Sequence, residues 1–417
     1  MTSGSNHQQP SSPWRDPRIP ILWCAQTINA FGDMLTFLAL PMLVYSATGS
    51  MALLALTIFV DSVPMIFLSP LAGALADRWD RRRLLVMSSL LCAVLTVPPA
   101  LVGDDWLIAT IMITVALKSA VQSCFRPAVS AILPALVSRQ QLLGVNAAFG
   151  TSFQAVLFLG PLIGAVIVSY GGMRMLLLID SLTFLVAALL LGRLALPDTI
   201  AGSSARVAWA TLRRDIAIGF RHLRSSRLLM IILGIGVVTM FGQGFITPAW
   251  LPYVVEVLHE PAESFGILVS VQGLGFLLGS LAVLFLGLRQ GRNTLGLYVF
   301  FLIASGSAIF LQVTTTAFPL FLVWATLVGV FGAGRNVLTT TLIQEQVEPS
   351  LLGRITSTMQ MCRQTAHLTA VLVAGVIADL MSTADLFFLA CLLWLIGCVG
   401  GALSILTMRP ARTAEAA

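Results

Sequence analysis

Long apolar segments recur along the chain, and short polar stretches separate them. A helix that crosses a lipid bilayer needs about 20 mostly apolar residues. Twelve segments reach that length, at approximately 19–45, 51–76, 84–103, 106–126, 142–169, 174–194, 228–255, 264–288, 294–313, 317–341, 355–380 and 385–407. The pattern therefore predicts an all-α integral membrane protein with twelve transmembrane helices.

One longer polar stretch interrupts this pattern and leaves six spans on each side. Its second part, Trp209 to Arg224, is a basic amphipathic segment. We expect five parts: a cytoplasmic N-terminal tail (1–18), an N-terminal six-helix bundle (19–195), a cytoplasmic linker with an amphipathic helix (196–227), a C-terminal six-helix bundle (228–408) and a cytoplasmic tail (409–417).

The composition narrows the class of protein. Hydrophobic residues make up 57% of the chain and charged residues only 10%, whereas soluble proteins contain roughly 25% charged residues. These proportions exclude a soluble enzyme, a nucleic-acid-binding domain and a disordered chain. The first 18 residues hold no apolar core, so we expect no cleavable signal peptide. The six cysteines lie in or beside apolar segments without paired spacing, which indicates free packing thiols and no metal site.

Arginine is distributed unevenly between the polar loops. If the N-terminus is cytoplasmic, nearly all arginines fall in cytoplasmic segments, whereas the outer loops hold one cation, Arg174, together with several acids. This one-sided distribution is the positive-inside signature. It predicts that both termini and the central linker face the cytoplasm.

The two halves of the chain carry matching positions. Leu142–Gly144 in the first half corresponds to Leu351–Gly353 in the second, and Arg126 corresponds to Arg335 at the same offset of about half the chain. Weak internal symmetry of this kind is typical of a transporter built from repeated halves.

The loop between the second and third spans, Gly73–Arg83, reads G-A-L-A-D-R-W-D-R-R-R. It resembles the G-x-L-x-D-R-x-G-R-R loop of the major facilitator superfamily. The resemblance implies the major facilitator fold, in which two pseudo-symmetric six-helix bundles enclose a central cavity. Asp80 replaces the glycine of the pattern, and aspartate tolerates a left-handed backbone better than most residues. The alternative is a generic basic loop that only sets the topology.

The acid and the arginines of this loop can form a bistable ion-pair cluster at the cytoplasmic mouth. Together with the repeat-related arginines, the predicted cytoplasmic gate motif comprises Gly73, Asp77, Arg78, Arg81, Arg82, Arg126 and Arg335.

A second motif, Gly160-Pro161-Leu162-Ile163-Gly164 in the fifth span, resembles the G-P-x-x-G-G signature of drug:proton antiporters. Ala165 replaces its last glycine. We expect Gly160, Pro161 and Gly164 to let this helix pack closely and bend; an ordinary small-residue packing face is the alternative. The segments Phe125–Pro134 and Leu142–Ala147 resemble the macrolide-efflux and enterobactin-exporter type proteins of this branch. That resemblance implies alternating access driven by proton influx.

Ionisable residues inside a membrane are costly and are candidates for function. Asp33 lies near the middle of the first span, which lines the cavity in the family that the chain resembles. Asp61 lies at similar depth in the second span. Desolvation favours a protonated carboxyl, so Asp33 and Asp61 are the candidates for proton coupling, with a structural hydrogen bond as the alternative for each. The repeat-related neighbour of Asp33, Gln243, is uncharged.

Lys118 is the only lysine in the chain and lies inside the fourth span. It can pair with Asp33 or Asp61, or hold an anionic substrate. We expect Asp180, on a helix that the resemblance makes peripheral, to be structural. The candidates for contact with a substrate in the cavity are Lys118, Gln154, Gln243 and His367.

These observations predict a secondary exporter of small amphipathic compounds, such as a drug, an antibiotic or a siderophore, by proton antiport in the plasma membrane (the bacterial inner membrane). A symporter or lipid translocator on the same fold, and a non-transporting sensor or assembly factor, are the alternatives.

The sequence contains no G-x-x-x-x-G-K-[ST] loop, so it gives no indication that the protein uses ATP directly. We expect no enzyme activity, no cofactor and no metal. The expected partners are a small-molecule substrate, protons and the lipid bilayer, with no nucleic acid, and the carrier is expected to be monomeric.

Overall fold

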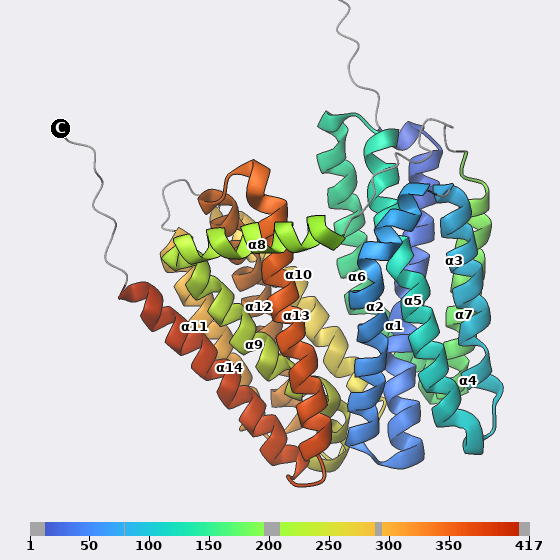
Figure 1. Ribbon diagram of the computed structural model, residues 1–417. Helices are drawn as coiled ribbons and strands as arrows, with labels where there is room; N and C mark the ends of the chain where they lie inside the picture. Colours follow the sequence, from blue (N-terminus) through green and yellow to red (C-terminus); the bar gives the residue numbers. More distant parts are fainter. Residues whose placement is uncertain (1–12, 79, 196–208, 288–293, 408–417) are drawn as a thin grey trace, which may run out of the picture. The chain divides into compact units, whose positions relative to one another are not determined.

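The computed structural model describes residues 13–78, 80–195, 209–287 and 294–407. Within these ranges nearly every residue is helical and no β-strand is found (Figure 1). Eleven of the twelve predicted spans each coincide with one long helix, and the span 84–103 coincides with two consecutive helices, so the predicted all-α membrane fold is confirmed.

The helices of the first half are α1 (Arg18–Thr48), α2 (Met51–Arg78), α3 (Arg81–Thr96), α4 (Pro98–Leu101), α5 (Asp104–Leu136), α6 (Arg139–Gly171) and α7 (Met173–Gly192). Those of the second half are α8 (Trp209–Ser225), α9 (Arg227–Pro252) with a π-helical turn η3 (Tyr253–Val257), α10 (Ser264–Gly287), α11 (Thr294–Val313), α12 (Phe318–Gln346), α13 (Pro349–Ile377) and α14 (Thr383–Leu406).

When only the described residues are considered, these helices form ten spans long and apolar enough to cross a membrane, and α3 with α4, like α9 with η3, counts as one span. Met51–Pro64 of α2 is a shorter apolar helix. α13 is not among the ten; it is as long as its neighbours but carries Arg363, Gln364 and His367 in its interior. Polar residues in a membrane helix mark positions that face protein or a water-filled cavity rather than lipid.

The edges of several elements differ from the prediction. α5 continues to Leu136, past the predicted end at 126, and α13 begins at Pro349, before the predicted start at 355. The hydropathy pattern predicts only the apolar part of a helix, and these two helices are longer than their apolar parts. The predicted span 84–103 is divided into α3 and α4 at Pro98 and Pro99, because proline lacks the N–H that would continue the helical hydrogen bonds.

The chain divides into two compact units. Unit 1 comprises Met1–Phe37, Val63–Val156 and Arg174–Arg206, and unit 2 comprises Leu38–Ser62, Leu157–Met173 and Val207–Ala417. Three helices of the first half, α1, α2 and α6, therefore contribute one end to each unit.

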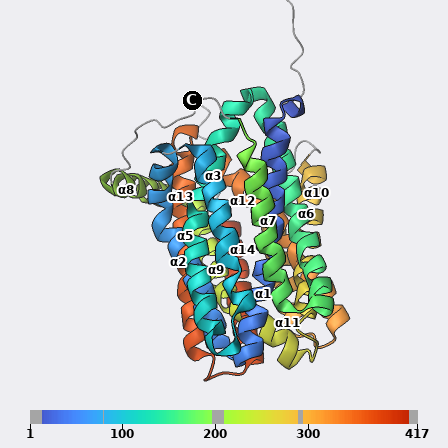
Figure 2. The ribbon, with the colours of Figure 1, turned by 90° about the vertical axis from the view of Figure 1, so that its right-hand side faces the viewer.

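The core of unit 1 lies among α1, α3, α5, α6 and α7. Its buried side chains include Leu22, Leu85, Ile132, Val145 and Leu191, one from each of these helices. Figure 2 shows α1, α3, α5 and α7 side by side. Because neighbouring helices in lipid are held mainly by close packing, this core fixes the rotation of each helix and with it the direction of the polar side chains.

In unit 2, α9 packs against α13 and α14, while α12 packs against α10 and α11. α10 and α12 approach closely because Gly275 and Gly279 face the backbone of α12, where a Cβ atom would collide with carbonyl oxygens. The amphipathic helix α8 contacts α13 and runs across the long helices of this unit (Figure 1). Its bounds agree with the predicted segment 209–224.

α1 and α7 approach closely at Gly32. A Cβ atom at this position would collide with the Thr183 hydroxyl and with a carboxylate oxygen of Asp180. The absence of a side chain at Gly32 is therefore what lets these two helices come together inside unit 1.

We expect Gly32→Ala to lower the free energy of unfolding by about 1–3 kcal/mol, because an added methyl group forces well-packed helices apart. The measurement is the midpoint of thermal unfolding of the purified protein in detergent. Gly150→Ala is the matched control, because nothing lies near a Cβ atom at Gly150 on α6 and alanine is the better helix former by about 1 kcal/mol. Equal midpoints for the two variants would contradict the close approach at Gly32.

Candidate functional site

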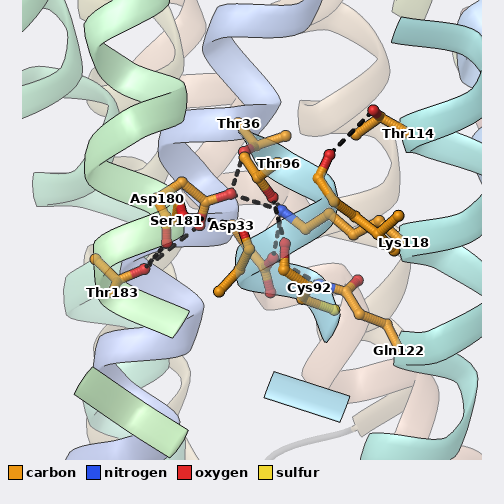
Figure 3. Close-up of polar contacts among 12 residues, drawn as sticks. Asp33, Thr36, Cys92, Thr96, Thr114, Lys118, Gln122, Asp180, Ser181 and Thr183 are labelled. Atoms are coloured by element: carbon orange, nitrogen blue, oxygen red, sulfur yellow. Dashed lines mark hydrogen bonds and ion pairs between the residues drawn. The ribbon is translucent and has the colours of Figure 1, made fainter. Parts of the chain in front are cut away.

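The membrane interior of unit 1 contains a cluster of three charged side chains. Lys118 comes from α5, Asp33 from α1 and Asp180 from α7. The Lys118 Nζ atom lies 2.7 Å from Asp180 Oδ2 and 3.3 Å from Asp33 Oδ1. Figure 3 shows the ammonium between the two carboxylates. One cation is therefore shared by two acids from different helices.

Neighbours one helical turn away complete the hydrogen bonding of the cluster, as helical spacing allows. Thr36 follows Asp33 on α1; its hydroxyl donates to Asp180 Oδ2 and lies 3.3 Å from Lys118 Nζ. Gln122 follows Lys118 on α5, and its Nε2 atom donates to Asp33 Oδ1 at 2.7 Å. The cluster thus binds α1, α5 and α7 together through side chains of both acids and of the cation.

Aromatic and small residues enclose the ammonium. Lys118 Nζ lies 4.6 Å from the centre of the Phe184 ring, a distance at which a cation is attracted to the π face. Phe184 is itself buried with Cys92 and Ala93. Lys118 is therefore held inside the unit, and its side chain does not extend to an interface.

The two acids differ in exposure. The Asp180 side chain is 0% exposed and that of Asp33 is 38% exposed. Removing an ion from water costs several kcal/mol, so two carboxylates with one ammonium leave a surplus charge that protonation of one carboxyl removes. Asp33 is the more exposed of the two carboxyls, whereas Asp180 keeps the shorter contact with Lys118.

The structure brings together two of the residues predicted from the sequence, Asp33 and Lys118. The other predicted proton-coupling residue, Asp61, lies on an exposed position of α2 in unit 2. Gln154 is half-buried on α6 in unit 1, and its Oε1 atom is buried without a hydrogen-bond partner. Gln243 on α9 and His367 on α13 are half-buried in unit 2.

The sequence analysis did not predict that Asp180 pairs with Lys118. The signal was an acid inside the otherwise apolar α7, but the expected peripheral position of that helix led us to expect a structural residue. Thr36 and Gln122 carried no signal of their own. Their role follows from the rotation of α1 and α5, which the hydrophobic pattern leaves open.

The predicted gate motif is described only in part. The surroundings of Gly73 and the side chains of Asp77, Arg78 and Arg126 lie outside the described part of the structure. Arg82 is exposed at the start of α3 and donates a hydrogen bond to the Gly192 carbonyl at the end of α7. Arg81, beside it, is half-buried.

Asp80 has a different role from the one expected. Its backbone has φ −57° and ψ 112°, so it is not left-handed. Its carboxylate instead accepts hydrogen bonds from the backbone N–H groups of Arg82 and Arg83 and caps the N-terminus of α3. Aspartate is among the residues that cap helices best, which explains how it serves at the position of the glycine.

The predicted packing motif lies buried in α6, with Gly160, Pro161 and Gly164 all inaccessible. The Pro161 carbonyl faces α10 at Gly266, where a Cβ atom would lie 2.8 Å from it. The glycine that allows this approach is therefore supplied by α10.

Arg335, the second-half residue of the gate prediction, lies on α12. Its guanidinium is 5.3 Å from the centre of the Trp394 ring of α14. It also lines a small pocket inside unit 2.

Long apolar helices with a buried ionic cluster define a multi-span membrane protein. The sequence profile of the Major Facilitator Superfamily matches residues 22–366 and, in a second match, 232–417. The chain belongs to this superfamily of membrane transporters.

Two curated relatives are similar over most of their length. Macrolide efflux protein A of Streptococcus pyogenes is 22% identical over 375 residues, which cover 88% of this chain and 91% of the relative. Multidrug efflux pump Tap of Mycobacterium tuberculosis is 24% identical over 378 residues, 88% of this chain and 88% of the relative. A solved structure of a variant of the nucleoside transporter NupG has the same fold, with a TM-score of 0.72 at 14% identity over 94% of this chain and 99% of that one. The predicted resemblance to the drug-efflux branch is confirmed.

Replacing Lys118 by methionine leaves the fully buried Asp180 without its cation. Removing one member of a buried ion pair costs about 3–5 kcal/mol, so Lys118→Met should lower the midpoint of thermal unfolding in detergent. The double variant Lys118→Met/Asp180→Asn should recover much of the loss, because it no longer buries the charge of Asp180.

Asp33→Asn is the control, because it keeps the 2.7 Å contact between Lys118 and Asp180. We expect its midpoint to fall less than that of Lys118→Met. A midpoint of Lys118→Met equal to that of the native protein would show that Asp180 does not depend on the ammonium.

Proposed function

We propose that this transporter is a secondary active exporter that exchanges small amphipathic compounds for protons by alternating access. The observation that carries the proposal is the sharing of one buried ammonium by two carboxyls, of which only Asp33 is accessible. The names of the relatives, a macrolide efflux protein and a multidrug efflux pump, support export and an amphipathic substrate.

Asp33 is the proton-binding group in this proposal. When Asp33 is ionised it attracts Lys118, which then has two acidic partners; when Asp33 is protonated that attraction is lost and Lys118 stays with Asp180. A change in protonation shifts a conformational equilibrium only by the difference in energy that it makes between the two states. Asp33 lies on α1 and Lys118 lies on α5, so protonation of Asp33 weakens the attraction between these two helices.

The exchange follows from where Asp33 gains and loses its proton. The proton binds from the outer side, where the proton-motive force makes protons abundant, and leaves to the cytoplasm. Substrate binds from the cytoplasm when the proton has left. Each cycle therefore moves one proton inward as substrate moves outward.

Alternating access also requires contacts that close one end and break when it opens. In unit 2 the Tyr45 hydroxyl near the end of α1 donates a hydrogen bond to Glu256 in η3. Thr383, at the start of α14, donates to the other oxygen of the same carboxylate. A helix of the first half is thus linked to two elements of the second half, and this link supports a closure at that end.

The orientation is part of the proposal. The arginine-rich loops face the cytoplasm, as do the termini, and the carrier lies in the plasma membrane of a bacterium. On this orientation the Tyr45–Glu256 contact lies at the outer end, since Glu256 belongs to the acid-bearing loops. The bundles 19–195 and 228–408, joined by the linker 196–227, are the parts that we expect to move, and the carrier works as a monomer.

Asp33→Asn should reduce export driven by a pH gradient to the level of vesicles that lack the protein, because the amide cannot bind and release a proton. Substrate binding should remain measurable. The assay is uptake of a radiolabelled macrolide into inverted membrane vesicles with and without an imposed pH gradient, with equilibrium binding measured on the same variant.

Asp104→Asn is the matched control, since Asp104 is 88% exposed and pairs with Arg174 at a helix end. It should transport as the native protein does. If Asp33→Asn transports as fast as the native protein at every pH, Asp33 is structural and Asp61 becomes the candidate to test next.

A further inference from the structure

Unit 2 buries two arginines in its membrane helices. Arg335 lies on α12, and Arg363 lies at the midpoint of α13 (Pro349–Ile377). Both side chains are half-buried, and the Nε atom of each is inaccessible and has no hydrogen-bond partner. Charged groups at such depth are rare because the membrane interior does not solvate them.

Both arginines line one small pocket. Polar groups from three helices share it: Tyr298 of α11, Asn336 and Thr339 of α12, and Thr239 of α9. The stem of Arg363 fits against α9 at Gly236, where a Cβ atom would lie 2.9 Å from its Cδ atom. Asn336 is exposed, so the pocket opens at the surface of the unit.

The charge in this pocket is unbalanced. Among the described residues no salt bridge joins Arg335 or Arg363 to an acid, whereas Lys118 in unit 1 has two acidic partners. The electrostatic neighbours of Arg363 are Arg335, which repels it, and Tyr298. The Trp394 ring attracts Arg335, but an aromatic ring carries no net charge and leaves the charge of the guanidinium unbalanced. An anion from outside the chain would supply the counter-charge that the described residues do not give to this pair.

We propose that Arg335 and Arg363 form a binding site for the carboxylate or phosphate group of an organic anion. Two guanidinium groups present paired N–H donors that match the oxygens of either group. Tyr298, Thr339 and Asn336 supply further hydrogen-bonding groups in the same pocket. The inference rests on the proposed export function and narrows its substrate class to amphipathic compounds with an acidic group. An anionic lipid headgroup has the same chemistry and is the second source of such a group.

The test measures equilibrium binding of two matched probes, naphthalene-1-acetate and its neutral amide, naphthalene-1-acetamide. The full-length protein is held in nanodiscs of zwitterionic lipid without any gradient. Hydrogen bonds to charged groups are worth about 1.5–3 kcal/mol, so the carboxylate should bind the native protein about tenfold or more tightly than the amide. Arg335→Gln and Arg363→Gln should each remove most of that preference, because they should weaken binding of the carboxylate far more than binding of the amide.

Arg354→Gln is the matched control, because Arg354 is an exposed arginine on the same helix as Arg363. It should keep the full preference for the carboxylate. Arg335→Lys and Arg363→Lys keep the charge but lose the planar fork, so they should show intermediate affinity, and they test the site if a glutamine variant does not fold. Equal affinity of the native protein for both probes would overturn the proposal, as would an unchanged preference in both glutamine variants.

Nanodiscs that contain phosphatidylglycerol separate the two sources of the anion. If this lipid competes with naphthalene-1-acetate in the native protein, and the competition is lost in Arg363→Gln, the anion site is supported with a lipid headgroup as its occupant. No competition would support a soluble anionic substrate. Because no gradient is used, failure of proton-coupled export would leave a measured preference for the carboxylate intact, and failure of that preference would leave proton coupling intact.

Discussion

The burial of the Lys118 ammonium is the constraint on which the first half of the molecule depends. A cation inside the bilayer is tolerated only with counter-charges and hydrogen bonds around it. Asp180 lies 2.7 Å from the Lys118 ammonium and is fully buried, and the more exposed Asp33 lies 3.3 Å from it. Because these acids stand on α7 and α1, the ammonium also decides which helices meet, and Gly32 is free of a side chain where α1 must approach Asp180.

The fold was predictable from the sequence, because membrane spans are selected by one property, an apolar length that matches the bilayer. The linker helix at Trp209–Ser225 was equally clear, since it has one polar and one apolar face, whereas a span is apolar on nearly all sides. The partners of Lys118 were harder to predict from the sequence. Sequence reasoning left Asp33 and Asp61 open as alternatives, and the choice depends on how α1 and α2 are rotated. That rotation is set by packing of small and large side chains between helices, which the hydrophobic pattern does not encode.

The two halves share a repeat but differ in charge. Gln243 stands beside the repeat position of Asp33, and at the offset that relates Arg126 to Arg335, the second-half residue Arg363 corresponds to the neutral Gln154. The first half thus places two acids around one cation, whereas the second half holds two arginines that no salt bridge joins to an acid among the described residues. Repeated halves that begin with the same fold can in this way divide the work, with proton binding in one and recognition of an anion in the other.

This division has an energetic consequence. A cell interior is electrically negative, so moving one charge across the membrane is worth about 2.3 kcal/mol per 100 mV. In the proposed exchange of one proton per cycle, export of a neutral compound moves one positive charge inward. Export of a monoanion in the same exchange moves the equivalent of two, so the electrical driving force is doubled. A pocket that selects anions through Arg335 and Arg363 therefore selects the substrates that the membrane potential itself expels most strongly, and the carrier gains concentrating power without any additional proton site.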